Sequence, residues 1–185
     1  MIHPPINHVF RDEDAKDLIV RCGEWDTSTT SENLPHQDIQ VEKVTYHPLL
    51  GNRQVDKVNY NIAVVMLEED FRLGKHISTM CLPEPYLTEF GSEDCFVTGF
   101  GSKEPNGDNE NIMKRYKLDL VERNECQSKI RNKTGDQFFG LHRFVTCAGG
   151  GENDINVCEN QGNPLICPGR NGQTYYQVSL VMNLT

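Results

Sequence analysis

The feature that most constrains the fold of this chain is a series of short, turn-bounded runs with the pattern of β-strands. Residues 115–121 alternate apolar and polar side chains, the period-two pattern of a half-buried strand. Residues 60–67, "YNIAVVML", predict a continuous strand that is buried on both faces. Further strand-like runs lie at 17–26, 39–48, 95–101, 163–169 and 174–182. Only residues 123–133 have a helical pattern, so the sequence predicts an all-β barrel or sandwich with long irregular loops.

A polar, proline-marked stretch, residues 81–95, separates two groups of these runs. Such a stretch predicts a connection between two subdomains. The whole chain has 185 residues, which suits one domain with enough length to bury a sizeable core.

The charge of the chain excludes several classes of partner. The 18 basic residues against 27 acidic ones give a net charge of −9. An acidic chain offers no basic face that could release counterions, so binding to nucleic acid or to an anionic membrane is not expected. The longest apolar run, residues 62–67, is far too short to span a bilayer, which predicts a soluble protein.

The chain contains seven cysteines, and their spacing indicates disulfides. They stand at positions 22, 81, 95, 126, 147, 158 and 167. No C-x-x-C pair or finger-spaced histidine cluster is present, so no metal site is expected. Wide spacing in a polar chain favours an oxidising compartment, with reduced cytosolic thiols as the alternative. The N-terminal stretch has no apolar core of a signal peptide, which suggests a shortened start.

Seven motifs narrow the interpretation. In chain order they are "LIVRCGEWDT", "LPHQDIQVEKVTYHP", "YNIAVVMLEEDF", "HISTMCLPEP", "CFVTGFGSK", "FFGLHRFVTCAGGGEND" and "VCENQGNPLICP". Together they resemble the chymotrypsin-like serine protease family over residues 8–182. More narrowly, they are similar to the arthropod clip-domain serine protease homologues, the group that includes the phenoloxidase-activating factors.

The resemblance implies an all-β fold of two antiparallel β-barrels of the trypsin/chymotrypsin type, with the active site in the cleft between them. It assigns residues 1–82 to a partial N-terminal barrel and residues 83–185 to a C-terminal barrel that lacks its last strands and helix. The activation start and the clip domain have no counterpart in the chain, which is therefore expected to be truncated at both ends.

The family's chemistry needs a serine nucleophile, a histidine base and a buried carboxylate that orients the histidine. The resemblance places Asn61 at the carboxylate position and Gln161 at the serine position, in a loop one residue shorter than the family pattern. Read from the residue alone, Asn61 is simply a polar residue at a strand start. His8 is the candidate for the histidine, and an exposed histidine in a frayed terminus is the alternative. No catalytic residue is therefore expected.

The resemblance also implies a pairing of the cysteines. Cys95 is expected to bond Cys167, and Cys126 is expected to bond Cys147. Cys158 has lost its usual partner, and the partner of Cys81 in the family lies upstream of the activation site. A Cys22–Cys81 bridge is open only because both residues are left over. Asn132 in "NKT" is a candidate glycosylation site.

By resemblance, the function is that of a non-catalytic, secreted protease homologue that needs no cofactor. Such proteins bind protein partners, a protease or a prophenoloxidase-type component, in a clip-protease cascade of innate immunity. Two alternatives remain. One is a fragment of an active trypsin-like endopeptidase, which Asn61 and Gln161 contradict. The other is a truncated copy without function.

Overall fold

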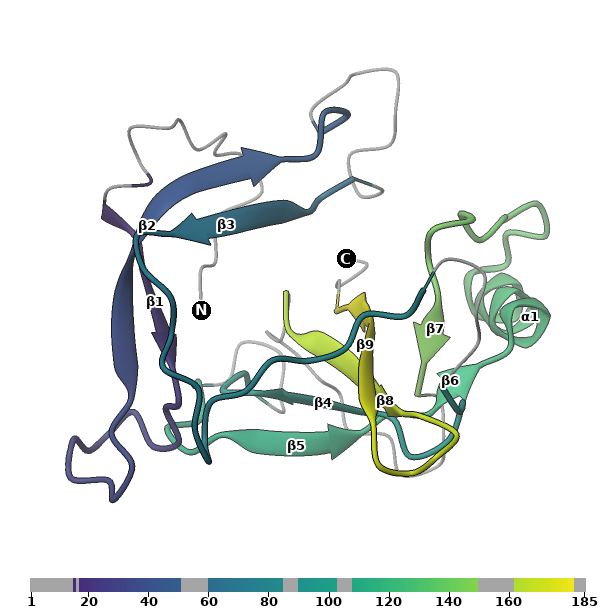
Figure 1. The fold of residues 1–185 in the computed structure, drawn as a ribbon. Coiled ribbons are helices and arrows are strands. Elements are labelled where there is room, and N and C mark those ends of the chain that lie inside the picture. Colours follow the sequence, from purple (N-terminus) through teal and green to yellow (C-terminus); the bar gives the residue numbers. More distant parts are fainter. Residues whose placement is uncertain are drawn as a thin grey trace. The chain divides into compact units, whose positions relative to one another are not determined.

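The computed structural model describes residues 15, 17–50, 60–84, 90–102, 108–149 and 162–181 (Figure 1). The chain divides into two compact units, Met1–Thr79 and Met80–Thr185. Within the described ranges there are nine strands and one helix, so the predicted predominance of β-structure is confirmed. No helix found there is both long enough and apolar enough to cross a membrane.

The first unit contains a three-stranded antiparallel sheet in the order β1–β2–β3. Its strands are β1 (Ile19–Cys22), β2 (Gln37–Tyr46) and β3 (Ala63–Leu67). The lower part of β2 pairs with β1 and its upper part pairs with β3, and the strand bends between the two parts (Figure 1).

A β-bulge between Val41 and Lys43 lies at this bend. In a regular strand, side chains alternate between faces, so residues 41 and 44 would point in opposite directions. The extra residue at the bulge returns both valines to one face. Val41 and Val44 are consequently buried together with Ala15, and they form the core of this unit.

The prediction that residues 60–67 are buried on both faces was wrong. Within β3, Val64 is 64% exposed and Met66 is 51% exposed, whereas Val65 and Leu67 pack against the core of the first unit. The physical reason is that the core covers only one face of this sheet, as the alternating burial of β2 also shows, so the side chains on the other face of β3 stay exposed. The apolar run thus has the composition of a strand covered on both faces but the burial of a strand covered on one.

The second unit contains a four-stranded antiparallel sheet in the order β5–β4–β8–β9. Its strands are β4 (Phe96–Gly99), β5 (Lys114–Lys117), β8 (Pro164–Pro168) and β9 (Tyr175–Leu180). The buried core consists of Cys95, Val97, Leu165 and Cys167, and the Cys95–Cys167 disulfide lies inside it. The covalent bond therefore crosses the best-packed part of the unit.

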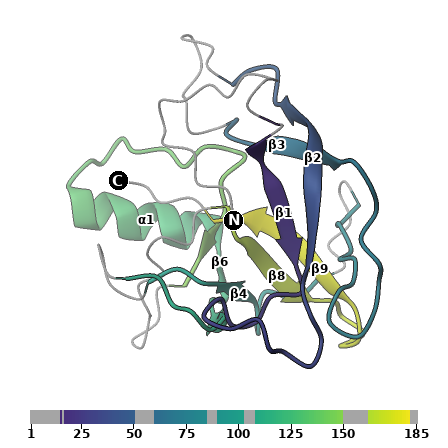
Figure 2. The ribbon, with the colours of Figure 1, turned by 90° about the vertical axis from the view of Figure 1, so that its left-hand side faces the viewer.

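A short helix and a two-stranded sheet complete the second unit. The helix α1 (Arg123–Thr134) follows β6 (Leu120–Val121), which pairs with β7 (Cys147–Ala148) (Figures 1 and 2). Glu122 caps the helix by accepting hydrogen bonds from the first backbone N–H groups, and Gly135 ends it with a φ of 75°. The expected Cys126–Cys147 disulfide joins α1 to β7. Across the described residues, the three sheets are not closed into barrels.

Candidate functional site

Asn61 lies in the first unit, two residues before the start of β3, and it is exposed. The turn that carries it is held by two contacts. His47 donates its backbone N–H to the carbonyl of Ile62 at 3.1 Å, and the imidazole of His47 stacks on the ring of Tyr60 with centroids 4.7 Å apart. The position is therefore fixed by its neighbours, but the amide that it presents carries no charge.

Gln161 lies outside the described residues, and the two residues after it form a fixed turn in the second unit. Gly162 has a φ of 80°, and its N–H donates to the carbonyl of Val181 at 2.9 Å. Val181 in turn donates its N–H to the carbonyl of Asn163 at 2.8 Å. Asn163 is only 4% exposed and leads directly into β8. Both residues of this turn are thus hydrogen-bonded to Val181, the residue that follows β9.

The chemistry available at these positions is limited. Asn61 offers a neutral amide, which cannot stabilise an imidazolium as a carboxylate does. His8 and Cys158 fall outside the described residues, as Gln161 does. Among the residues that the structure describes, no group of His, Cys, Asp and Glu side chains could hold a metal ion.

Two further cysteines and the glycosylation sequon lie within the described residues. Cys22, in the first unit, is half-buried, and Cys81, in the second unit, is exposed; both are free thiols. Asn132 is exposed in the last turn of α1. In the same sequon, the hydroxyl of Thr134 donates to the carbonyl of Ile130 at 2.8 Å.

The structure shows a charged network in the first unit that sequence reasoning missed. Arg21 and Asp38 face each other across β1 and β2, and both contacts between the guanidinium and the carboxylate measure 2.7 Å. Arg21 also reaches the buried carboxylate of Glu24 at 3.2 Å, and Nδ1 of His36 lies 2.9 Å from the same Glu24 oxygen. The bond from Arg21 lowers the pKa of Asp38. Such pairs depend on strand register, which the sequence pattern does not reveal.

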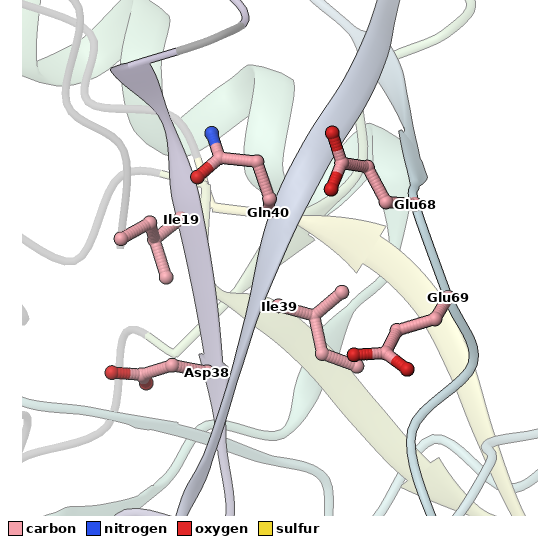
Figure 3. Close-up of a pocket in the computed structure, with 6 residues that line it drawn as sticks. All are labelled: Ile19, Asp38, Ile39, Gln40, Glu68 and Glu69. Carbon is pink, nitrogen blue, oxygen red and sulfur yellow. The ribbon is translucent and has the colours of Figure 1, made fainter.

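A hollow of about 490 Å³ opens beside this network (Figure 3). Its lining combines apolar and acidic side chains from three stretches of the first unit, namely Ile19, Asp38, Ile39, Gln40, Glu68 and Glu69. In Figure 3, Ile39 and Glu69 point toward one another. We call this feature the acidic hollow. No sequence motif signals it, because its residues are brought together only by the pairing of β2 with both β1 and β3.

Comparison with known proteins identifies the family of this chain. The family model described as Trypsin matches residues 6–181. Inactive CLIP domain-containing serine protease A28 of Anopheles gambiae is 35% identical over 89% of this chain and 42% of its own length. Phenoloxidase-activating factor 2 of Galleria mellonella is 34% identical over 83% of this chain and 50% of its own length. Inactive CLIP domain-containing serine protease A8 of Anopheles gambiae is 30% identical over 93% of this chain and 47% of its own length.

These relatives match the narrower group that the motifs indicated, and this chain spans about half of their length. The family model itself covers almost the whole chain, including both units and the turn at Gly162. The chain therefore belongs to the trypsin family.

Proposed function

We propose that this chain is a non-catalytic serine protease homologue that acts as a secreted protein cofactor in a clip-protease cascade. One observation carries the proposal. Asn61 stands where the family's catalytic carboxylate is expected, and Gln161 stands where the nucleophilic serine is expected. Both replacements are neutral amides, and neither can perform the role of the group that it replaces.

The energetic cost of these replacements supports the same conclusion. In serine proteases of this family, exchanging the aspartate for asparagine alone lowers turnover by about 10⁴-fold, because the imidazole is held in the wrong tautomer. The loss of the nucleophile removes the acylation step altogether. The exposure of Asn61 adds to this, because a solvated amide would orient a histidine less firmly than a buried group.

The relatives support the cofactor role and its compartment. Two of the three carry the word inactive in their names, and the third is named as a phenoloxidase-activating factor. The partners that we propose are accordingly a cascade protease or a prophenoloxidase-type protein. Two disulfides and the exposed sequon at Asn132 fit a secreted, glycosylated chain.

We also propose the two-barrel architecture, with residues 1–82 in the first barrel and residues 83–185 in the second. The antiparallel pairing within each unit supports it.

The first experiment tests the absence of catalysis. Purified chain is incubated with a serine-directed fluorophosphonate and with trypsin-type and chymotrypsin-type peptide esters, alongside active trypsin as the positive control. We expect neither labelling nor hydrolysis. The matched variant Gln161→Ser with Asn61→Asp should also remain inactive, because the shortened loop would misplace the oxyanion donors. Stoichiometric labelling of the unmodified chain would instead identify an active peptidase.

The second experiment tests the cofactor role. The chain is added to a mixture of prophenoloxidase and its activating protease, and phenoloxidase activity is followed over time. We expect an increase that depends on the amount of chain added, and no increase when the protease is omitted. No increase in the complete mixture would exclude the cofactor role even if the chain is inactive.

A further inference from the structure

The glycosylation sequon of this chain is folded into a helix. Asn132 and Thr134 both lie in the last turn of α1, and both residues are exposed. The hydroxyl of Thr134 is already engaged, because it donates to the carbonyl of Ile130 at 2.8 Å and accepts from the N–H of Asp136 at 3.3 Å. Exposure alone therefore does not make the folded sequon readable by an enzyme.

The helix also separates the two side chains that define the sequon. A transferase that recognises Asn-X-Ser/Thr contacts the Asn amide and the hydroxyl two residues later within one site. In an extended backbone these two side chains lie on the same face. In an α-helix, with about 3.6 residues per turn, side chains two residues apart point about 200° apart around the axis. Asn132 and Thr134 therefore project to nearly opposite sides of α1.

The end of α1 that carries the sequon is fixed by two contacts. Gly135 ends the helix with a φ of 75°, and its N–H donates to the carbonyl of Arg131 at 2.9 Å. The side chain of Arg131 donates from Nε to the carbonyl of Phe139 at 2.8 Å, so the loop after the helix, residues 136–146, folds back onto the last turn. The last turn is therefore held through both its backbone and a side chain.

Two further contacts join the same loop to the earlier turns of the helix. Gln127 accepts at Oε1 from the N–H of Leu141 at 2.9 Å. Arg123 donates from Nη2 to the carbonyl of His142 at 2.7 Å. Positions 123, 127 and 131 are spaced four residues apart, which places the three side chains on one face of the helix. The loop thus supports α1 along one face.

By itself, α1 is too weak a helix to keep the sequon folded. It has 12 residues, and isolated helices shorter than about 12–15 residues are marginal in water. Within it only Cys126 is buried, so little apolar packing stabilises it. The Cys126–Cys147 disulfide keeps the loop beside the helix and thereby maintains the three contacts. Before this bond closes, the sequon leaves the helical conformation readily.

We propose that Asn132 receives its glycan only while the Cys126–Cys147 disulfide is open, so that closure of this bond decides which molecules are glycosylated. In the transfer, Nδ2 of Asn132 bonds to C1 of an oligosaccharide carried on a lipid diphosphate. The C1–O bond to the phosphate breaks, the lipid diphosphate leaves, and Nδ2 gives up one proton to a base of the transferase. This inference rests on the secretion proposed above, because the transferase acts on chains that enter the secretory route.

The competing step oxidises the thiols of Cys126 and Cys147 to the disulfide. A disulfide-bonded oxidoreductase of the same compartment accepts their electrons and protons through thiol–disulfide exchange. During synthesis at about 5–20 residues per second, Cys147 follows Asn132 by about one to three seconds, and disulfides form in seconds to hours. Transfer and closure therefore compete on a similar time scale.

The folded protein tests the proposal directly. A chain carrying Asn183→Gln, which removes the second sequon, is purified with both disulfides oxidised. It is incubated with solubilised transferase and a lipid-diphosphate oligosaccharide, and mass spectrometry follows the modification of Asn132. We expect no transfer to the oxidised chain and transfer after reduction. Asn132→Gln should lose the product, which identifies the site.

The cysteine variant separates local release from general unfolding. Cys126→Ser with Cys147→Ser should accept the glycan without reduction, because the sequon is released while the Cys95–Cys167 bond stays closed. Circular dichroism confirms that the strands remain folded.

A glycine variant tests the same point without touching a cysteine. Gly135→Ala strains the left-handed residue that ends α1, so the last turn should fray more often. We expect transfer to the oxidised chain to rise by about fivefold. Gly140→Ala is the matched control, because an added Cβ there also meets no atom within 4 Å but Gly140 has no positive φ. It should leave transfer unchanged.

Translation into microsomes tests the competition itself. The chain is supplied with a cleavable leader, so its entry does not depend on secretion of the natural chain. Occupancy of Asn132 should rise when a reductant is present during translation, and in Cys126→Ser with Cys147→Ser under oxidising conditions. Absence of the chain from the medium of the cells that make it would contradict the proposed secretion alone.

Three results would overturn the proposal. The first is transfer to the folded, oxidised chain as fast as to the reduced chain. The second is equal occupancy of Asn132 under oxidising and reducing conditions in microsomes. The third is no transfer to Asn132 in any state of the chain, which would mean that the sequon is not used.

Discussion

At the scale of single residues, Glu24 shows how strongly the first unit depends on its charged network. Its side chain is buried, and one carboxylate oxygen receives contacts from both Arg21 and His36. Among the described residues, the other oxygen has no hydrogen-bond partner. A buried carboxylate is tolerated when nearby charges compensate it, so the loop before β2 is held against the sheet by electrostatics as much as by packing.

The network makes a prediction about acid stability. The pKa of Asp38 is lowered chiefly by the hydrogen bond from Arg21. Its stabilising contribution is therefore present above the unfolded pKa of about 3.9 and is lost as the pH falls through the lower, folded pKa. We expect Arg21→Met to reduce the loss of stability between about pH 6 and about pH 3. Urea unfolding at several pH values measures the free energy of unfolding of each variant, with Lys75→Met as the control. If the free energy of unfolding changed equally with pH in both variants, this assignment would be contradicted.

Gly162 carries a second prediction at this scale. Its φ of 80° lies in the left-handed region, and an added Cβ would meet no atom within 4 Å. Gly162→Ala should therefore destabilise the chain through backbone strain alone, by about 1 kcal/mol. Gly74→Ala is the matched control, because Gly74 also has open space but no positive φ, and it should be neutral or slightly stabilising. Thermal unfolding compares the two, and equal effects would mean that the turn is not constrained as described.

At the scale of elements, the Cys126–Cys147 disulfide joins a helix that has little apolar surface of its own. Within α1 only Cys126 is buried. Replacing both cysteines by serine opens a loop of 21 residues, which should lower the free energy of unfolding by about 3 kcal/mol. Denaturant unfolding under non-reducing conditions measures the loss. The intact Cys95–Cys167 bond in the same variant provides the internal reference, and an unchanged midpoint would contradict the expected contribution.

Elements differ in how far the sequence predicts them. The helix at 123–133 and the alternating run at 115–121 are visible from local patterns, because these patterns reflect local propensity and one buried face, although the run forms two strands, β5 and β6. The one-sided burial of β3 is not visible, because its apolar run is the same whether one or both faces are covered. The Arg21–Asp38 pair and the acidic hollow depend on register and on a bulge, which no local pattern encodes. The disulfide pairs came from family resemblance and not from spacing.

At the scale of the whole molecule, the two units differ in how firmly they are held. The second unit has a four-stranded sheet and two disulfides, and Cys95, Val97 and Cys167 in its core are fully buried. The first unit has a three-stranded sheet, a smaller core and an exposed apolar face on β3. Stability is therefore distributed unevenly along the chain.

This difference predicts the order of proteolysis. Under limiting protease, residues 1–60 should be cut before residues 90–180, because local opening exposes cleavage sites more often in the less stable unit. Mass spectrometry of the fragments over time identifies the surviving part. Keeping the disulfides oxidised is essential, and a parallel digestion after reduction should shorten the lifetime of the second unit. A first unit that outlasts the second would reverse this ranking.

The way in which α1 holds the loop after it, residues 136–146, has a consequence for how the surface of that loop can vary. The hydrogen bonds of Arg123, Gln127 and Arg131 join main-chain carbonyl and N–H groups of the loop. These groups are the same whatever side chains the loop carries. Substitutions at positions such as 138 or 143 can therefore change what the loop recognises while leaving its shape intact. The helix and the loop together form a display scaffold, on which new binding specificities could evolve or be grafted without redesign of the fold.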